Sequence, residues 1–224
     1  MSTNTDSQNT TIPWVDDQDP LPSPRTLIDP DPRFPGLLAL SDTLYPDRLL
    51  QAYRQGMFPW YSENEPVMWW CTHPRMVLET SSFKVSHSFK KTIQSIMHED
   101  DWEIRVNYAF LDTITSCASV NREGQNGTWI TEDIIDAYHQ LNLQGYVHSV
   151  ESWYQGELVG GLYCVNIGKM VYGESMFAHK TDASKIALAA LSAWCVSENI
   201  RYIDCQQETK HLASLGARPI SRDA

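Results

Sequence analysis

Three apolar runs in the second half of the chain, each following the last closely, constrain the fold most strongly. They cover Tyr146–Tyr154, Glu157–Ile167 and Met170–Phe177. Gly156 and the Gly168-Lys169 pair interrupt them at turn-forming positions. Because connections this short join antiparallel neighbours, the sequence predicts a three-stranded antiparallel meander.

Helical patterns flank the meander. Ala183–Asn199 is a long, alanine-rich stretch that predicts one helix, and from Ser86 apolar residues recur every three or four positions. Thr131 is placed to cap a further helix that Gly145 closes. Shorter elements are expected at Pro46–Gln55 (helix), Val67–Cys71 (strand), Met76–Glu79 (strand), Trp102–Val106 (strand), Tyr202–Cys205 (strand) and Lys210–Leu215 (helix). Helices on either side of a mixed, mainly antiparallel sheet give an α+β or α/β sandwich.

Residues 1–33 differ from the rest of the chain in composition. They are rich in Ser, Thr, Asn, Asp and Pro and have almost no apolar periodicity, which is typical of a disordered or extended tail. Order is expected from about Phe34 onward. With 224 residues, of which 42% are hydrophobic, the chain can bury one main core with a small attachment.

No run of residues is apolar and long enough to span a bilayer, and the first residues do not have the pattern of a secretory signal. A cytoplasmic protein without membrane association is therefore expected. The five cysteines form no CxxC pair, and the seven histidines form neither HxH nor HExxH. Buried free thiols and no metal site are the resulting predictions.

The net charge of −11 is unusual for a nucleic-acid partner, because phosphate contacts normally dominate that affinity. Any RNA contact must use a locally basic patch, and Lys90 and Lys91 after Ser86 are the candidates. The acidic balance also suits a cationic protein substrate.

Two tryptophans stand in polar, turn-like contexts. Trp60 follows Pro59, and Trp129 follows Asn126-Gly127-Thr128. A ring near a loop suits stacking on a nucleotide base, whereas Trp69 and Trp70 are better explained by core packing.

Three polar residues interrupt otherwise apolar strands. Glu174 could face an ammonium group inside a pocket, and the alternative is a glutamate that faces solvent. Asp204 and Gln206 stand two residues apart at a strand end, so both side chains should share a face. There Asp204 could accept from the Gln206 amide and fix the direction of its carbonyl. A structural strand cap is the alternative.

Ordered sequence blocks from Gly36 to the C-terminus identify a family. The blocks are Phe58-Pro59-Trp60-Tyr61, Trp69-Trp70 with His73-Pro74-Arg75, Asn107-Tyr108-Ala109-Phe110, Cys117-Ala118, Gly127-Thr128-Trp129-Ile130, Ala137-Tyr138, His148-Ser149-Val150-Glu151, Leu158-Val159-Gly160-Gly161-Leu162-Tyr163, Gly173-Glu174-Ser175-Met176-Phe177, Ala183-Ser184-Lys185, Ile203-Asp204-Cys205-Gln206 and Ser214-Leu215-Gly216-Ala217. With these blocks, the chain resembles the leucyl/phenylalanyl-tRNA–protein transferases.

The resemblance implies an α+β architecture: a small N-terminal domain, placed at 34–80, and a larger catalytic domain of the GNAT acyltransferase fold, placed at 81–224. It implies a monomer that moves leucine or phenylalanine, and in some cases methionine, from aminoacyl-tRNA to an N-terminal Lys or Arg of a protein. This transfer tags the acceptor for degradation by the N-degron pathway. No cofactor is expected.

Site residues follow from the same resemblance. Trp60 and Trp129 would hold the terminal adenosine, Glu174 would order the site around an amino group, and Asp204 and Gln206 would be the catalytic pair. The pocket for the transferred side chain would be lined by Leu162, Met176, Leu188, Leu191 and Ile203. The chain departs from the family pattern at Cys164, where glycine is usual, at Thr209, where asparagine is frequent, and in stopping at Ala224.

Two rival functions make different demands on the sequence. An acetyl-CoA-dependent acetyltransferase needs a glycine-rich pyrophosphate loop before the long helix, and residues 178–184 contain no glycine. A non-catalytic RNA-binding module should be basic, and this chain is acidic.

Overall fold

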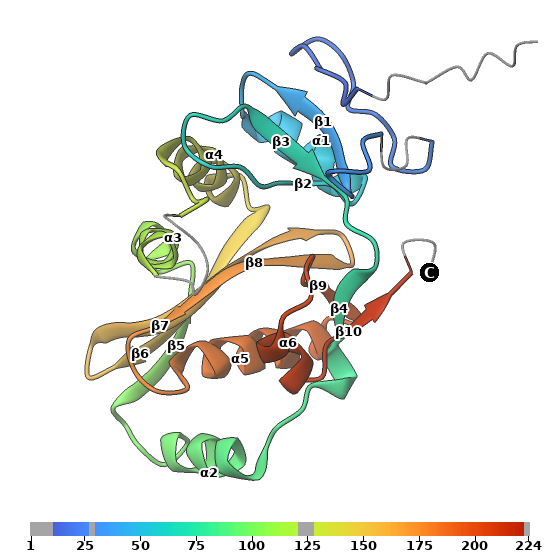
Figure 1. Ribbon diagram of the computed structural model, residues 1–224. Coiled ribbons are helices and arrows are strands. Elements are labelled where there is room, and N and C mark those ends of the chain that lie inside the picture. Colours follow the sequence, from blue (N-terminus) through green and yellow to red (C-terminus); the bar gives the residue numbers. More distant parts are fainter. Residues whose placement is uncertain (1–10, 27–29, 121–127, 222–224) are drawn as a thin grey trace, which may run out of the picture. The chain divides into compact units, whose positions relative to one another are not determined.

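The computed structural model describes residues 11–26, 30–120 and 128–221. The chain divides into two compact units, residues 1–73 and residues 74–224 (Figure 1). The expected boundary between residues 80 and 81 is therefore seven residues too late. Strand β4 (Arg75–Glu79) explains the difference, because it pairs with strands of the second unit and not of the first.

The first unit is built on a small antiparallel sheet and one helix. Strands β1 (Leu37–Ser41), β3 (Val67–Trp70) and β2 (Phe58–Pro59) lie in that order. Helix α1 (Pro46–Arg54) begins with a proline in its first turn, where the missing N–H costs nothing. Trp69 is fully buried and its indole Nε1 donates to Ser41 Oγ over 2.9 Å, which confirms its core role.

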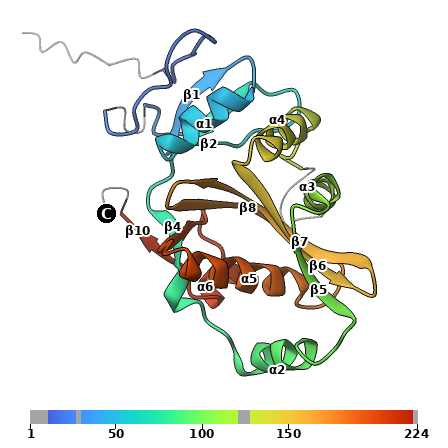
Figure 2. The same cartoon turned by 180° about the vertical axis from the view of Figure 1, so that it is seen from behind.

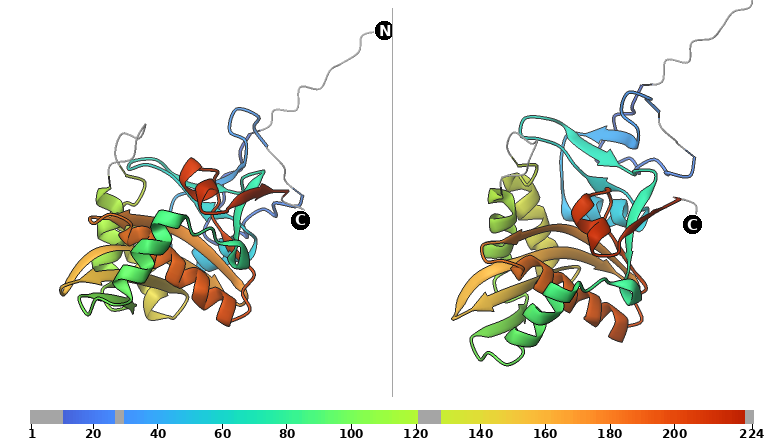
Figure 3. Two further views of the ribbon diagram at one scale, coloured as in Figure 1. Left: turned by 90° about the horizontal axis from the view of Figure 1, so that it is seen from below. Right: turned by 60° about the horizontal axis from the view of Figure 1, so that its bottom comes forward.

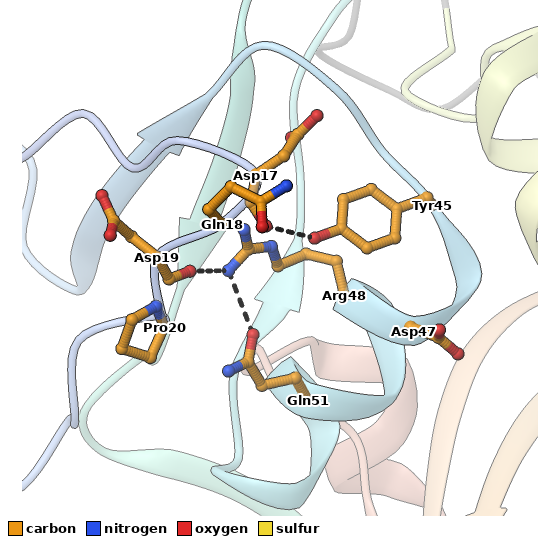
Figure 4. A pocket seen from close by; sticks show the side chains of 8 residues that line it. All are labelled: Asp17, Gln18, Asp19, Pro20, Tyr45, Asp47, Arg48 and Gln51. Atoms are coloured by element: carbon orange, nitrogen blue, oxygen red, sulfur yellow. Dashed lines mark hydrogen bonds between the residues drawn. The ribbon is translucent and has the colours of Figure 1, made fainter.

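Part of the expected tail packs onto this unit, so residues 11–26 are not a free tail. Val15 and Leu21 are buried. The buried Arg48 guanidinium of α1 donates to the backbone carbonyls of Asp16 and Asp19, over 2.9 Å and 2.6 Å. An open cleft of about 360 Å³ surrounds this contact, and Figure 4 shows the side chains that line it. It is lined by Asp17, Gln18, Asp19, Pro20, Tyr45, Asp47, Arg48 and Gln51. The first ten residues of the expected tail lie outside the described residues.

The second unit contains a mixed, mainly antiparallel sheet in the order β10-β4-β9-β8-β7-β6-β5. Only the β8–β9 pair of these neighbours is parallel. The strands not yet given are β5 (Trp102–Val106), β6 (Val147–Tyr154), β7 (Glu157–Ile167), β8 (Met170–Ala178), β9 (Tyr202–Asp204) and β10 (Arg218–Ile220). Strands β6, β7 and β8 confirm the predicted meander.

Helices cover both faces of this sheet. Figures 2 and 3 show α5 (Ala183–Ser197) running along one face, and α3 (Phe110–Ser119) and α4 (Glu132–Leu143) lie on the other. The remaining helices are α2 (His87–Ile96), α6 (Lys210–Ser214) and the short 3-10 turn η1 (Thr80–Ser82). The fold is therefore α+β, as expected.

Successive side chains of β7 point to opposite faces of the sheet, which explains how helices pack on both faces. On one face, Leu162 belongs to the buried cluster that contains Leu188 and Leu191 of α5. A Cβ on Gly160 would lie 2.5 Å from the Ala183 Cβ, so only glycine lets α5 come this close. On the other face, the Tyr163 ring meets the Phe110 ring of α3 edge-on at 6.4 Å.

Candidate active site

A bulge in β8 determines where Glu174 points. Tyr163 of β7 pairs with Ser175, and Cys164 pairs with Gly173, so Glu174 is an extra residue with no direct opposite. A β-bulge of this kind re-aims a side chain and commonly lies beside a functional site. Strand alternation therefore does not predict the orientation of Glu174, and the site depends on this local irregularity.

The Glu174 carboxylate accepts hydrogen bonds from two sides. The Tyr138 hydroxyl of α4 donates to Oε2 over 3.3 Å, and the Gln206 side-chain Nε2 donates to Oε1 over 3.0 Å. Tyr138 is fully buried, with its ring edge-on to Tyr163 at 5.5 Å. Because a carboxylate only accepts, Gln206 presents its NH₂ group to Glu174 and directs Oε1 the other way.

Gln206 follows β9 in a left-handed turn. Its φ of 54° is unusual for a residue other than glycine. Two contacts hold the turn: its backbone N–H donates to Asp204 Oδ1 over 2.9 Å, and its carbonyl accepts from Met76 N over 3.4 Å. Gln206 is buried. The unusual backbone is thus fixed by its neighbours, as expected for strain kept at a working site.

The predicted side-chain bond between Asp204 and Gln206 is wrong. The Gln206 amide donates to Glu174, whereas Asp204 accepts the Gln206 backbone N–H. The prediction assumed that both residues lie on one strand, but β9 ends at Asp204 and the positive φ of Gln206 turns the chain. Sequence spacing alone cannot reveal that turn.

Arg75 is the residue that sequence reasoning missed. Its Nε lies 2.8 Å from Oδ1 and 2.9 Å from Oδ2 of Asp204. Both side chains are buried, with exposures of 9% and 5%. An aspartate within an apolar strand needs a cation or several donors, and Arg75 begins the apolar strand β4. That requirement was the available signal. For Tyr138 the signal was a hydroxyl on the buried, otherwise apolar face of α4.

The five residues expected to line a pocket lie together on the α5 face. Leu162, Leu188, Leu191 and Ile203 belong to one buried cluster, and Met176 is half-buried against it. Leu162 and Met176 are direct partners across β7 and β8. The structure therefore gathers these side chains into one buried apolar cluster, and Met176 stands two positions after Glu174 on β8.

The tryptophans differ in their surroundings. Trp129 is half-buried in the irregular segment before α4, in which Ile130 N donates to Thr128 Oγ1 over 3.1 Å. Trp60, in the first unit, is also half-buried. Its ring is tilted against Trp70 at 5.5 Å, and Trp70 Nε1 donates to the Trp60 carbonyl over 2.7 Å. Trp70 is half-buried too, so its packing is less complete than that of Trp69.

Lys90 and Lys91 are exposed on α2, which Ser86 caps by accepting from Phe89 N. Thr92 of the same helix donates to Asp182 Oδ2, at the start of α5, over 3.4 Å. Farther along the chain, burial and the Lys185 ammonium lower the pKa of His211. Lys90 and Lys91 are thus exposed cations in an otherwise acidic chain.

The cysteines are buried free thiols, as predicted. Burial raises the pKa of the Cys205 thiol to about 12 and raises that of Cys164 as well. A thiol is nucleophilic only as a thiolate, so Cys205 is unsuited to attack a substrate although it adjoins Gln206. Across residues 11–26, 30–120 and 128–221, no three His, Cys, Asp or Glu side chains are grouped to hold a metal ion. No helix within those ranges could cross a membrane.

Known proteins resemble this chain over almost its full length. A family model for leucyl/phenylalanyl-tRNA protein transferase matches residues 77–224, and one for its N-terminal domain matches residues 42–73. The leucyl/phenylalanyl-tRNA–protein transferase of Cupriavidus taiwanensis is 59% identical, over 94% of this chain and 84% of that protein. The transferase of Ralstonia pickettii is 55% identical, over 95% of this chain and 86% of that protein.

Solved structures give weaker similarities. An aminoglycoside N-acetyltransferase in complex with CoA is 16% identical, with a TM-score of 0.37 over 50% of this chain and 81% of that chain. A GCN5-related N-acetyltransferase from Kribbella flavida has a TM-score of 0.35 at 10% identity, over 79% of this chain and 61% of that one. The family matches are far stronger. The chain belongs to the leucyl/phenylalanyl-tRNA–protein transferase family of aminoacyltransferases.

Proposed function

We propose that this protein transfers leucine or phenylalanine, and in some cases methionine, from aminoacyl-tRNA to the N-terminal Lys or Arg of acceptor proteins. Transfer would mark the acceptor for degradation by the N-degron pathway. The observation that carries the proposal is the Gln206 amide, whose NH₂ is bound to Glu174. This contact fixes the direction of the amide oxygen of a buried side chain.

The chemistry needs alignment more than activation, because the tRNA ester is already reactive. The acceptor α-amine attacks the ester carbonyl, a new amide C–N bond forms, and the C–O bond to the ribose breaks. The proton lost by the amine passes to the ribose oxygen. An α-amine titrates near pH 8, so a useful fraction is neutral at physiological pH. Weak assistance therefore suffices.

In this proposal Gln206 is the catalytic residue that touches the amine. Its Oε1 accepts an N–H of the acceptor and points the nitrogen lone pair at the ester. Glu174 holds the amide in that direction and adds negative charge near the ammonium form of the acceptor. Asp204 is a positioning residue, since its oxygens accept from Arg75 and from the Gln206 backbone.

The donor is held by parts that recognise different features of aminoacyl-tRNA. Trp129 and Trp60 are proposed to stack on nucleotide rings, since a half-exposed indole suits that contact. Lys90 and Lys91 are proposed to contact phosphates. The apolar set of Leu162, Met176, Leu188, Leu191 and Ile203 is proposed to receive the transferred side chain. We place this reaction in the cytoplasm and assign it to the monomer.

A CoA-dependent reaction is less well supported. In that case the start of α5 should receive a pyrophosphate on free helix-terminal N–H groups. Here Asp182 occupies that place with a φ of 64°, and its carboxylate accepts from Lys185 Nζ over 2.7 Å. A carboxylate at this position repels phosphate. Residues 178–184 also lack glycine.

Two labelled donors test the proposal against this rival. The protein is incubated with a Lys-starting acceptor and either radiolabelled Leu-tRNA or radiolabelled acetyl-CoA. Label should enter the acceptor only from Leu-tRNA, and an Ala-starting peptide should accept far less than an Arg-starting one. Transfer from acetyl-CoA, or equal transfer to both peptides, would refute the assignment.

A further inference from the structure

We propose that Arg75 is a positioning residue for aminoacyl transfer, acting through Asp204 on the left-handed turn at Gln206. The inference rests on the proposed function. It adds a residue on β4 that touches no substrate but fixes the direction of the group that does.

The contact between Arg75 and Asp204 is well suited to fixing a carboxylate. A single Nε lies within hydrogen-bond distance of both oxygens, at 2.8 Å and 2.9 Å. Both side chains are buried. In such surroundings solvent screens the attraction between the two charges only weakly, and water is not available to take the place of either partner in the hydrogen bonds. The Asp204 carboxylate therefore has one orientation.

That orientation is what Gln206 requires. Oδ1 of Asp204, which faces Arg75, also accepts the Gln206 backbone N–H over 2.9 Å. A second connection runs from the same strand: Cys205 N donates to Met76 O over 2.8 Å, and Met76 N donates to Gln206 O. Adjacent residues of β4 thus hold the turn, one by its side chain and one by its backbone.

This left-handed turn directs the Gln206 side-chain amide toward the Glu174 carboxylate. A residue other than glycine at a φ of 54° lies in an unfavourable region and stays there only while its surroundings compensate. Without Arg75, Asp204 can rotate, the backbone hydrogen bond weakens, and Gln206 is free to relax toward negative φ. The amide would then leave Glu174, so turnover should fall while substrate affinity remains.

Two substitutions separate the roles of the Arg75 hydrogen bond and charge. Arg75→Gln keeps a donor nitrogen the same number of bonds from Cα as Nε, but without the charge. Arg75→Met keeps only the length. Since misplacing a group by about 1 Å can cost about 100-fold, we expect kcat to fall about 100-fold in Arg75→Met and about 10-fold in Arg75→Gln. The donor KM should stay within about twofold.

Arg201 supplies a matched control, because it too pairs with a carboxylate between β4 and its neighbour. Its Nε donates to Glu79 Oε1 over 3.1 Å, but the Arg201 side chain is 70% exposed. Arg201→Gln removes this surface pair, which contributes little. Its kcat and KM should equal those of the wild type.

A second readout needs no substrate. Hydrogen exchange at the Gln206 backbone amide, measured by NMR, should be slow in the wild type and in Arg201→Gln, faster in Arg75→Gln and fastest in Arg75→Met. If the wild type transfers nothing, the proposed function fails, yet the exchange series still tests the positioning.

Three results would overturn the inference. They are a folded Arg75→Met with wild-type kcat, a loss of kcat without faster exchange at Gln206, and an equal loss in Arg201→Gln. If Arg75→Met does not fold, Arg75→Gln carries the test, and wild-type kcat with wild-type exchange in that variant contradicts the proposal.

Discussion

The two faces of the seven-stranded sheet are built on different principles. On the α5 face, aliphatic side chains such as Leu78, Leu162 and Leu191 pack together in one buried cluster. On the face of α3 and α4, polar side chains such as Glu151 and Tyr138 are equally buried but linked by hydrogen bonds. Apolar packing tolerates small changes in side-chain orientation, whereas hydrogen bonds fix the orientation of the groups that they join. Besides holding the proposed side-chain pocket, the α5 face should supply most of the stability, and the other face should fix the geometry of the site.

The largest expected effect is a loss of stability from a substitution in the packing of the α5 face. Leu78→Ala removes a fully buried side chain of β4, and the cavity should lower the free energy of unfolding by about 2–5 kcal/mol. Urea unfolding followed by circular dichroism measures it, with Leu143→Ala, exposed on α4, as the control. Turnover per folded molecule should stay normal. A loss of kcat larger than the loss of folded protein would contradict the claim that Leu78 contributes to stability and not to the geometry of the site.

Glu151 is the corresponding test on the opposite face. Its Oε1 accepts from the N–H groups of Tyr108 and Ala109, and its Oε2 accepts from Trp153 Nε1. Glu151→Gln replaces one acceptor oxygen by a donor, so we expect a loss of about 1–3 kcal/mol and faster amide exchange at the start of α3. Glu103→Gln, half-exposed on β5, is the control. Equal amide exchange rates in the two variants would argue against the role of Glu151 in capping the start of α3.

The next prediction concerns Trp129 and its proposed contact with the aminoacyl-tRNA donor. Trp129→Ala should weaken binding of a minimal donor ending in adenosine by about 1–3 kcal/mol, the usual contribution of base stacking. Isothermal titration measures the affinity, and Trp194→Ala, another partly exposed tryptophan, serves as the control. Unchanged affinity in the folded Trp129 variant would assign this ring to packing alone.

The smallest effect concerns the exposed cations of α2. Changing Lys90 and Lys91 to Glu should raise KM for aminoacyl-tRNA and reduce the salt slope of binding by about 2, since each phosphate contact contributes nearly one unit. A minimal donor should be much less affected. If both donors suffer alike, these lysines have a structural role.

The same contrast explains what could be predicted from the sequence. The meander, α5 and α1 follow from periodicity, turn residues and Pro46, all of them local signals. Helix α3 was missed because its N-cap, Ala109, has no capping side chain. Glu151 satisfies that helix start from 42 residues away, and no local pattern reveals it.

The candidate site was only partly predictable for a related reason. Its residues Glu174, Asp204 and Gln206 stand out as polar groups in apolar strands, but their pairing depends on a bulge and on a positive φ. Both features arise from tertiary packing. Arg75 remained unnoticed because its partner lies 129 positions away.

The central claim is that Glu174 and Gln206 act as one unit. The most direct measurement is kcat, with melting temperature, for Glu174→Gln, Gln206→Ala and the double variant. Each single change should lower kcat about 100-fold, and the double variant should be scarcely worse, because residues that act together are not additive. Melting temperatures should change little. Additive losses, or normal turnover in a folded Gln206→Ala, would contradict the account.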